Sequence, residues 1–164
     1  MCIRDRAKSV LAPTFASWQG AQRIPLYGAI GGFSQPGMAA NRVLVEQVMS
    51  LAAEIGEARW LELCAGSGNF SLPLALSGAD VVAWEVDRLA LAGLTREAEE
   101  QGVTVQTAPL NIHRASPRLG EALEEAAPGA ILADPPRSGL GGFIDVLGST
   151  ALRPAILYLS LIHI

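Results

Sequence analysis

The sequence is poor in cysteine, in charged residues and in long apolar runs. Its two cysteines, Cys2 and Cys64, are too few for the disulfide framework of a small secreted domain, so we expect a cytoplasmic protein. No stretch reaches the roughly 18 consecutive apolar residues that a membrane span requires. Residues 1–10 carry basic side chains, but no apolar segment of a secretory signal follows them. A membrane partner is therefore not expected.

Positive charge is scarce as well. The chain has 12 Lys and Arg residues and 16 Asp and Glu residues, which gives a net charge of -4 at pH 7. This balance does not indicate a nucleic-acid-binding protein, so any RNA binding must come from local features or from an absent module. His113 and His163 are isolated and lack metal-ligand spacing, so we expect no metal site and interpret His113 as a surface residue.

Apolar residues, in contrast, are abundant. They make up 50% of the chain, its mean hydropathy is +0.31, and only 17% of its residues are charged. A chain of 164 residues is long enough for one domain with a sizeable core. The composition is apolar for a complete soluble domain. It suits either a parallel sheet buried on both faces or a fragment whose core partners are absent.

Five short apolar runs with β-branched residues are predicted to be strands. They cover residues 60–65, 81–86, 103–110, 130–135 and 155–160. Their near-continuous apolar character is typical of strands that are covered on both faces. Because helical patterns alternate with these runs, we predict an α/β fold with a doubly wound, mostly parallel sheet.

The segment before these strands is predicted to contain a hairpin and a helix. Residues 7–34 are punctuated by Gly, Ser and Pro and are predicted to form short strands or a hairpin. Residues 35–56 are predicted to form a helix, because Pro36 suits its first position and apolar residues follow with helical spacing. These apolar residues are Leu44, Val48, Leu51 and Ile55.

Two further helices are predicted between the strands. The first, over residues 88–102, has one apolar face and ends at Gly102, a residue suited to the position just after a helix. The second begins with Ser116 as its N-cap and Pro117 as its first helical residue. The apolar face of the first consists of Leu91, Leu94 and Ala98.

Residues suited to ligand binding follow the strands at their carboxyl ends, where ligands bind in open α/β sheets. The first strand runs into a turn with Gly66 and Gly68, which let the backbone approach a ligand without a Cβ in the way. The second strand ends at Glu85, 19 positions after Gly66. An acid at this distance typically accepts hydrogen bonds from ribose hydroxyls. The fourth strand delivers Asp134.

Two cofactors fit a glycine turn that is followed by such an acid. A nicotinamide dinucleotide prefers a third glycine, and Ser71 occupies that position. S-adenosylmethionine has no pyrophosphate and therefore demands less of the loop. A tight turn without any ligand is the remaining interpretation of Gly66 and Gly68.

The segment Asp134-Pro135-Pro136-Arg137 favours chemistry at the end of the fourth strand. Prolines fix φ and remove backbone donors, so the segment is expected to form a rigid lip instead of continuing the strand. A carboxylate on such a lip can hold a substrate or cofactor group at a set distance. An Asx turn at Asp134 is the alternative, and the segment alone does not decide between the two.

Four segments carry a resemblance to a known family. "LELCAGSGNFSLPLA" (61–75) is similar to a cofactor loop, "ADPPRSGL" (133–140) to a specific signature, and "ILYLS" (156–160) to the strand after it. "FSQPG" (33–37) resembles an F-x-Q-x-N motif, with Gly37 in place of its asparagine. In this order and spacing they resemble the S-adenosylmethionine-dependent RNA uracil-5-methyltransferases, which methylate C5 of uridine in tRNA and ribosomal RNA.

The resemblance implies a fold, a cofactor and a partner. The fold is a Rossmann-like class I methyltransferase, the cofactor is S-adenosyl-L-methionine, and the substrate is rRNA or tRNA, in a protein expected to be a monomer. It also implies which residues line the cofactor and target-base pocket. These are Gln35, Cys64, Gly66, Gly68, Asn69, Glu85, Asn111 and Asp134.

The same resemblance implies a covalent mechanism. C5 of uracil is a poor nucleophile, so in the family a cysteine thiolate adds to C6, C5 attacks the methyl group, and a base removes the C5 proton. That cysteine follows the strand that "ILYLS" resembles, where this chain has Leu161. The family's general base has no counterpart, and Cys64 is expected to be a small buried residue rather than a substitute nucleophile. The chain is therefore expected to be inactive by itself.

These departures predict an incomplete chain. Residues 33–160 are predicted to be an incomplete methyltransferase domain whose final strands are missing, which leaves the fifth strand as an exposed edge. Residues 1–32 are predicted to be an N-terminal extension, partly irregular or non-native, and residues 161–164 a non-native tail. Another class I methyltransferase and a non-catalytic cofactor- or RNA-binding module remain as alternatives, and a nicotinamide oxidoreductase ranks behind them.

Overall fold

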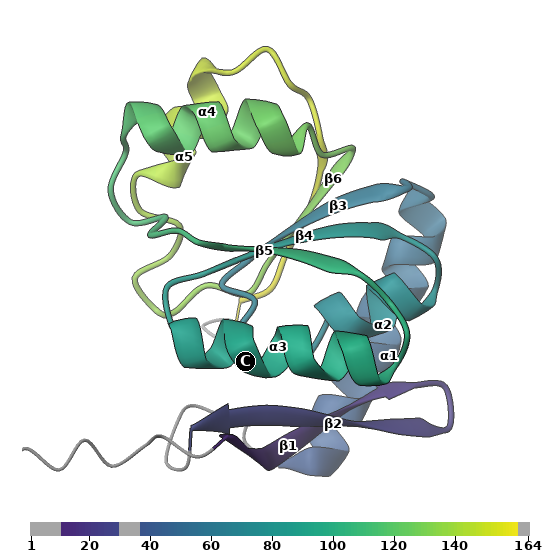
Figure 1. Cartoon of the computed structure of the whole chain (residues 1–164). Helices are drawn as coiled ribbons and strands as arrows, with labels where there is room; N and C mark the ends of the chain where they lie inside the picture. The colour runs from purple at the N-terminus through teal and green to yellow at the C-terminus, as the bar shows by residue number, and fades with distance from the viewer. Residues whose placement is uncertain (1–10, 30–36, 161–164) are drawn as a thin grey trace, which may run out of the picture.

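The computed structural model describes residues 11–29 and 37–160, and Figure 1 shows a parallel sheet between two helical layers with a hairpin beneath. The elements, in chain order, are β1 (Leu11–Gln19), β2 (Gln22–Ala29), α1 (Met38–Ile55), β3 (Arg59–Leu63), α2 (Ser71–Leu76), β4 (Asp80–Glu85), α3 (Arg88–Glu100), β5 (Val105–Pro109), α4 (Pro117–Ala126), β6 (Ala130–Ala133), α5 (Phe143–Ser149) and β7 (Ala155–Tyr158).

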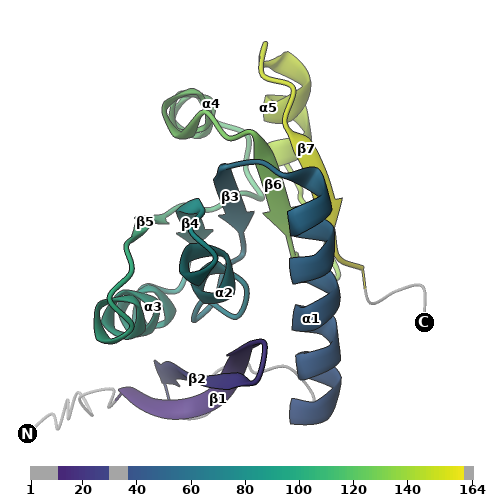
Figure 2. The ribbon, with the colours of Figure 1, turned by 90° about the vertical axis from the view of Figure 1, so that its right-hand side faces the viewer.

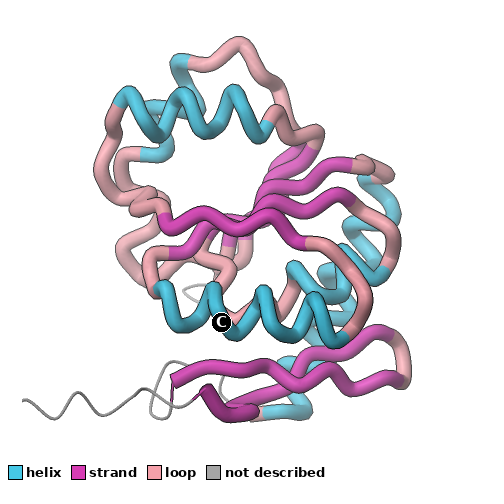
Figure 3. The backbone as a smooth tube through the Cα atoms, viewed as in Figure 1, coloured by secondary structure: helices cyan, strands magenta, loops and turns pink. Residues whose placement is uncertain are grey.

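The sheet has the strand order β5-β4-β3-β6-β7, and every neighbouring pair is parallel. The first strand of this sheet along the sequence is β3, which lies in the centre. Strands β4 and β5 follow on one side, and the chain then crosses to β6 and β7 on the other side. The predicted doubly wound α/β fold is therefore confirmed. Figure 3 shows the strands between the two layers of helices.

Two apolar clusters hold the helices on the two faces of the sheet. In β3, Trp60 faces the cluster that contains α1, α2 and α3, whereas Leu61 and Leu63 face the cluster that contains α4 and α5. This alternation follows from the two-residue period of a strand. The central strand is buried on both faces, as its apolar sequence predicts.

The prediction that all five strands are covered on both faces is wrong for the two edge strands. In β5, Val105 is buried but Gln106 and Thr107 are exposed. In β7, Ile156 and Tyr158 remain 50% and 46% exposed. Both strands pair with a single neighbour, so the helices that cover the centre of the sheet cover its edges only in part.

Helices α3 and α4 form as predicted. The apolar face of α3 is buried, and Gly102 follows the helix with a φ of +70°. The hydroxyl of Ser116 accepts the N–H of Leu119 at 3.2 Å as an N-cap, with Pro117 as the first helical residue.

Helix α1 differs from the prediction in part of its buried face. It begins at Met38 with Gly37 as its N-cap, whereas Pro36, the predicted first position, lies outside the described residues. Val48 is buried, and Leu44 and Ile55 pack in part against the core. Leu51 is 42% exposed, so the buried face is centred to one side of the predicted spacing. That face contains a polar and a small residue, which apolar spacing does not detect. It consists of Asn41, Val45, Val48 and Ala52.

The predicted N-terminal hairpin is confirmed as the antiparallel pair β1–β2. It packs against α3, where a Cβ on Gly93 would lie only 1.9 Å from the carbonyl oxygen of Tyr27. The Arg96 guanidinium lies over the Tyr27 ring at 4.0 Å, and the Gln22 and Gln101 side chains share a hydrogen bond. Residues 11–29 are thus joined to the sheet domain through α3. No helix in the described part of the chain is long and apolar enough to cross a bilayer.

Candidate functional site

Three neighbouring strands end side by side at one edge of the sheet. Leu63 of β3 pairs with Trp84 of β4 and with Ala133 of β6. The next residue of each strand is therefore level with the others, which brings Cys64, Glu85 and Asp134 to the same edge. The two carboxylates both act electrostatically on the Cys64 thiol, which agrees with this placement. Glu85 and Asp134 thus lie on the same side of the molecule.

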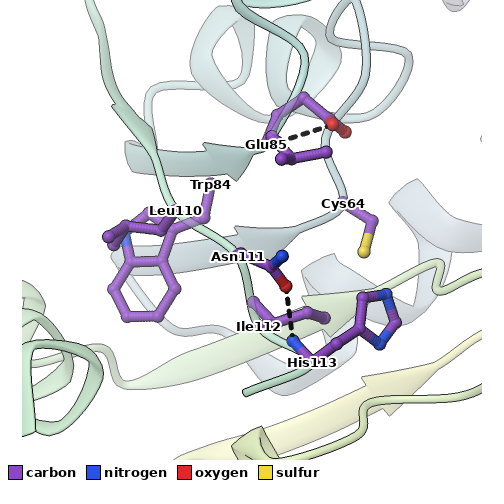
Figure 4. A pocket seen from close by; sticks show the side chains of 8 residues that line it. Cys64, Trp84, Glu85, Leu110, Asn111, Ile112 and His113 are labelled. Atoms are coloured by element: carbon purple, nitrogen blue, oxygen red, sulfur yellow. Dashed lines mark hydrogen bonds between the residues drawn. The ribbon is translucent and has the colours of Figure 1, made fainter. Parts of the chain in front are cut away.

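A small hollow of about 60 Å³ opens beside this edge, between the ends of β3 and β4 and the loop after β5 (Figure 4). Its wall is apolar on one side, and the indole of Trp84 packs edge-to-face on Phe143 of α5 with ring centres 6.0 Å apart. A carboxylate, an amide and an imidazole supply polar groups around it. The lining residues are Cys64, Trp84, Glu85, Val86, Leu110, Asn111, Ile112 and His113.

The carboxylate of Glu85 organises the backbone around the hollow. One oxygen accepts the N–H of Gly66 at 3.0 Å, and the other accepts the N–H groups of Val86 and Asp87 at 2.6 and 2.9 Å. A carboxylate has about four acceptor positions, so one position stays available on the oxygen that faces Gly66. Glu85 therefore ties the loop after β3 to the end of β4 and can still accept one hydrogen bond from a ligand.

Cys64 occupies a strained position at the end of β3. Its φ is +60°, a left-handed conformation that non-glycine residues rarely adopt and that clusters at functional sites. Burial raises the pKa of the Cys64 thiol to about 12, and the nearby carboxylates of Glu85 and Asp134 act in the same direction. The thiol therefore stays protonated at neutral pH. A nucleophile needs the thiolate, so Cys64 is suited to lining the hollow and not to covalent chemistry.

The two glycines of the loop after β3 serve different purposes. Gly66 has a φ of +54°, and a Cβ there would meet no atom within 4 Å, so its backbone is open to a ligand. A Cβ on Gly68 would instead lie 2.3 Å from Cδ1 of Leu94, because α3 packs directly against this residue. Gly68 thus permits the close approach of a helix, and Gly66 the approach of a ligand.

Asn69 directs its side chain toward α1. Its amide makes two reciprocal hydrogen bonds with the amide of Asn41 in α1, at 2.8 and 2.9 Å. The side-chain amide is therefore already paired in this structure. A contact between Asn69 and a cofactor remains a prediction.

Asn111 and His113 form the far wall of the hollow. The Asn111 side-chain oxygen accepts the N–H of His113 at 2.9 Å, which closes an Asx turn after β5. The side-chain nitrogen of Asn111 takes no part in this bond. His113 is exposed, as predicted, but sequence reasoning did not place it in the hollow.

The proline lip after β6 is braced against this loop. The Gly142 N–H donates to the carbonyl of His113 at 3.1 Å, and the Phe143 N–H donates to the carbonyl of Ile112 at 3.0 Å. The Gly139 N–H closes a turn onto the carbonyl of Pro136 at 2.8 Å. The lip is therefore held at both ends, and Asp134 stands at its start, beside the end of β3.

Glu62 is a buried acid that sequence reasoning missed. It lies on β3, 1% exposed, and accepts a hydrogen bond from the hydroxyl of Ser71. Its pKa is raised to about 8, chiefly by burial; the Ser71 hydrogen bond lowers this pKa, and the Asp134 and Glu85 carboxylates raise it. The signal was present in the sequence, because an acid stands in the middle of an apolar strand. Two predicted positions, Gln35 and Leu161, lie outside the described residues.

Comparison with known proteins identifies the family. A family model described as tRNA (uracil-5-)-methyltransferase matches residues 21–161. The chain belongs to this family. Uracil-5-methyltransferases of this family depend on S-adenosylmethionine, and the loop after β3, the proline lip and β7 all lie within the matched residues.

Curated relatives of this uracil-5-methyltransferase family member include both rRNA and tRNA enzymes. A 23S rRNA (uracil(1939)-C(5))-methyltransferase of Halomonas elongata is 36% identical over 78% of this chain, which covers 27% of that protein. An uncharacterized RNA methyltransferase of Bdellovibrio bacteriovorus is 32% identical over 84% of this chain and 36% of its own length. A tRNA/tmRNA (uracil-C(5))-methyltransferase of Pseudomonas entomophila is 30% identical over 79% of this chain and 38% of its own. The chain thus spans between about a quarter and two fifths of these relatives.

Solved structures confirm the class I methyltransferase fold. The Pyrococcus abyssi tRNA (uracil-54, C5)-methyltransferase, in complex with S-adenosyl-L-homocysteine, matches with a TM-score of 0.69 and 19% identity, over 90% of this chain and 34% of that chain. A T. thermophilus 16S rRNA N2 G1207 methyltransferase matches with a TM-score of 0.61 and 24% identity, over 88% of this chain and 40% of the other.

Proposed function

We propose that this chain is the cofactor-binding part of an RNA methyltransferase that transfers a methyl group from S-adenosylmethionine to C5 of uridine in rRNA or tRNA. The observation that carries the proposal is the convergence of Glu85, Asp134 and the open loop at Gly66 at the carboxyl edge of a parallel sheet. Ligands bind at this edge in open α/β folds. Membership of the family supplies the substrate class.

The described residues fit an adenosyl cofactor. Glu85 keeps one acceptor position for a ribose hydroxyl, and the exposed backbone of Gly66 lets the ligand approach. Leu110 and Ile112 offer apolar contact to an adenine ring, and the side-chain nitrogen of Asn111 can donate to one of its ring nitrogens. If both ribose hydroxyls donate to Glu85, its carboxylate must release one of its three backbone N–H groups, because only one acceptor position is available.

Asp134 and the proline lip are assigned to the reactive end of the cofactor. When bound, S-adenosylmethionine supplies an electrophilic methyl group. The lip is fixed by its prolines, and the segment that follows it is held to the loop after β5 by the N–H groups of Gly142 and Phe143, so the lip can hold the target base at a set distance from Asp134. Gln35, which the family resemblance places at the same pocket, is proposed to contact the base.

We further propose that this chain does not complete the reaction by itself. Methylation at C5 of uracil requires a thiolate that adds to C6, and the corresponding position by resemblance is Leu161. Cys64 is not a substitute, because its thiol is protonated at neutral pH. The cofactor site and the nucleophile are thus proposed to be separable, with only the first in this chain.

Isothermal titration of the chain with S-adenosylhomocysteine tests the cofactor site. We expect saturable binding, no binding of NAD⁺, and at least tenfold weaker binding in Glu85→Ala, because hydrogen bonds to a charged group contribute about 1.5–3 kcal/mol. Glu99→Ala, which removes an exposed acid at the far end of α3, is the matched control and should bind as the wild type does. Preference for NAD⁺, or equal affinities of the two variants, would contradict the proposal.

RNA that contains 5-fluorouridine tests the absence of a nucleophile, because this base traps the covalent intermediate. After incubation with the chain and S-adenosylmethionine, we expect no adduct on a denaturing gel. An adduct that disappears in Cys64→Ser would show that Cys64 is the nucleophile and would overturn the assignment of that residue to the wall of the hollow.

A further inference from the structure

A buried polar network joins the hairpin, helix α1 and the loop after β3. Asn41 in α1 is 2% exposed and Ser17 in β1 is fully buried. The Asn41 side-chain nitrogen donates to the carbonyl of Ala16 at 3.1 Å and to the side-chain oxygen of Asn69 at 2.8 Å. The Asn41 oxygen accepts from the Asn69 nitrogen at 2.9 Å, and the Ser17 hydroxyl donates to the Asn69 carbonyl at 2.5 Å.

The network uses the whole hydrogen-bonding capacity of the Asn41 nitrogen. Its two hydrogens are spent on two different acceptors, one in the hairpin and one in the loop. Asn69 is held through its side chain by α1 and through its backbone carbonyl by β1. A buried network in which the donors are paired fixes one geometry, whereas removal of a single member leaves buried groups unpaired.

Packing also restrains the loop between Gly66 and Phe70, because Gly68 lies directly against Leu94 and the Phe70 side chain is 1% exposed in the core. Its polar restraints are fewer, and α2 begins without a side-chain cap at Phe70. The Gly68 N–H donates to the carbonyl of Ala65 at 2.9 Å, and Glu85 holds the N–H of Gly66 at the opposite end. Asn69 is therefore the point at which the hairpin and α1 hold the second half of the loop by hydrogen bonds.

We propose that Asn41 is a positioning residue for cofactor binding, and that with Ser17 it holds Asn69 so that the hairpin forms part of the cofactor site. The proposal rests on the proposed function, because it concerns the same loop. In Figure 2 the hairpin lies below α2 and α3 and beside the lower part of α1. The hairpin thereby acts on the ligand site through the Ser17 hydrogen bond to Asn69.

The test combines ligand affinity with loop protection in the full chain. S-adenosylhomocysteine affinity is measured by titration for Asn41→Ala, Asn69→Ala, Ser17→Ala and the Asn41/Asn69 double variant. We expect each single variant to bind about tenfold more weakly, and the double variant to bind no more weakly than Asn41→Ala, because both changes break the same pair. Amide hydrogen exchange of residues 65–70, without ligand, should be faster in each variant.

Gln22→Ala is the matched control. It removes a hydrogen bond between the hairpin and α3 that has no link to the loop, so it should leave affinity and loop exchange unchanged. If Asn41→Ala does not fold, Asn69→Ala and Ser17→Ala decide the question. Wild-type affinity and wild-type loop exchange in these two variants would overturn the positioning role.

The two proposals fail in different ways. If the wild-type chain does not bind S-adenosylhomocysteine, the proposed function fails. Loop exchange still decides whether the network holds residues 65–70, because that measurement needs no ligand. If the wild type binds and the network variants bind equally well, the proposed function stands and the positioning role falls.

Discussion

At the scale of single residues, one buried carboxyl group should dominate the pH dependence of stability. Glu62 is enclosed on β3 with the Ser71 hydroxyl as its partner, and burial raises its pKa from 4.5 to about 8. The folded chain therefore keeps a proton on Glu62 at neutral pH, whereas the unfolded chain releases it. The stability that this group contributes is fully present below about pH 4.5 and is lost as the pH rises through about 8.

Glu62→Gln should remove this dependence. Glutamine is neutral, has the same shape and keeps an acceptor for Ser71, so the variant should resemble the wild type near pH 5. Near pH 8 it should be more stable by roughly 2–4 kcal/mol, because each unit of pKa shift corresponds to about 1.4 kcal/mol. Urea unfolding at pH 5, 6.5 and 8 measures the difference.

An exposed acid supplies the control for this experiment. Glu99→Gln removes the same kind of group from the surface of α3 and should leave the pH profile of the wild type unchanged. Parallel stability curves for the wild type and Glu62→Gln would show that Glu62 is charged in the folded chain.

At the scale of elements, the hairpin depends on the absence of one methyl group in α3. A Cβ on Gly93 would lie 1.9 Å from the Tyr27 carbonyl oxygen, a backbone atom that cannot move without the strand. Gly93→Ala should therefore displace the hairpin from α3 and lower the free energy of unfolding by about 1–3 kcal/mol, as overpacking does elsewhere. Thermal or urea unfolding measures this loss.

Gly148→Ala is the opposite case in another helix. Gly148 lies in α5, and a Cβ there would meet no atom within 4 Å. The same substitution should therefore stabilise the chain by about 0.4–1 kcal/mol, because alanine restricts the unfolded chain. If Gly93→Ala and Gly148→Ala lowered the free energy of unfolding by the same amount, the loss in Gly93→Ala would not come from the contact with the hairpin.

Local signals in the sequence predicted the helices and strands. Where a prediction of burial failed, contacts with other elements were the cause. Ser116 and Pro117 predicted the start of α4 because an N-cap is a property of adjacent residues. The exposure of Gln106 and Ile156 depends on the position of β5 and β7 at the edges of the sheet, which no local pattern contains. Apolar spacing found Val48 but not Asn41 on the buried face of α1, because Asn41 is polar and owes its burial to partners on β1 and in the loop.

The candidate site was predictable where a residue directly follows a strand. Cys64, Glu85 and Asp134 meet because parallel strands in register end at one edge. The role of Gly68 could not be predicted from its place after a strand. Its lack of a side chain makes room for Leu94, a residue that lies 26 positions later. Asn41 was missed because its role comes from contacts with β1 and the loop after β3, which are distant in the sequence. Glu62 was missed although an acid within an apolar strand signalled it.

At the scale of the whole molecule, the two edges of the sheet differ in chemistry. β5 exposes Gln106 and Thr107, whereas β7 exposes Ile156 and Tyr158. An apolar edge strand invites pairing with another chain, and a charge on the edge opposes it. Ile156→Lys should therefore reduce association at high concentration, which sedimentation velocity measures, without changing the thermal midpoint by more than a few degrees.

Ile144→Lys tests whether the edge is responsible. Ile144 is 60% exposed but lies in helix α5, so the substitution adds the same charge to a surface without free strand hydrogen bonds. It should reduce association less than Ile156→Lys. Equal effects of the two variants would attribute association to general surface hydrophobicity instead of β7.

The attachment of the hairpin to α3 also affects how the protein is made. The ribosome releases Ile24 and Leu26 first, but α3, which helps to bury them, follows about 70 residues later, which corresponds to several seconds of translation at about 5–20 residues per second. During this interval the nascent hairpin lacks the α3 part of its docking surface, and the apolar side chains that α3 covers are open to chaperones or to neighbouring nascent chains. Synonymous codons that slow elongation between the two segments should therefore lower the yield of correctly folded protein.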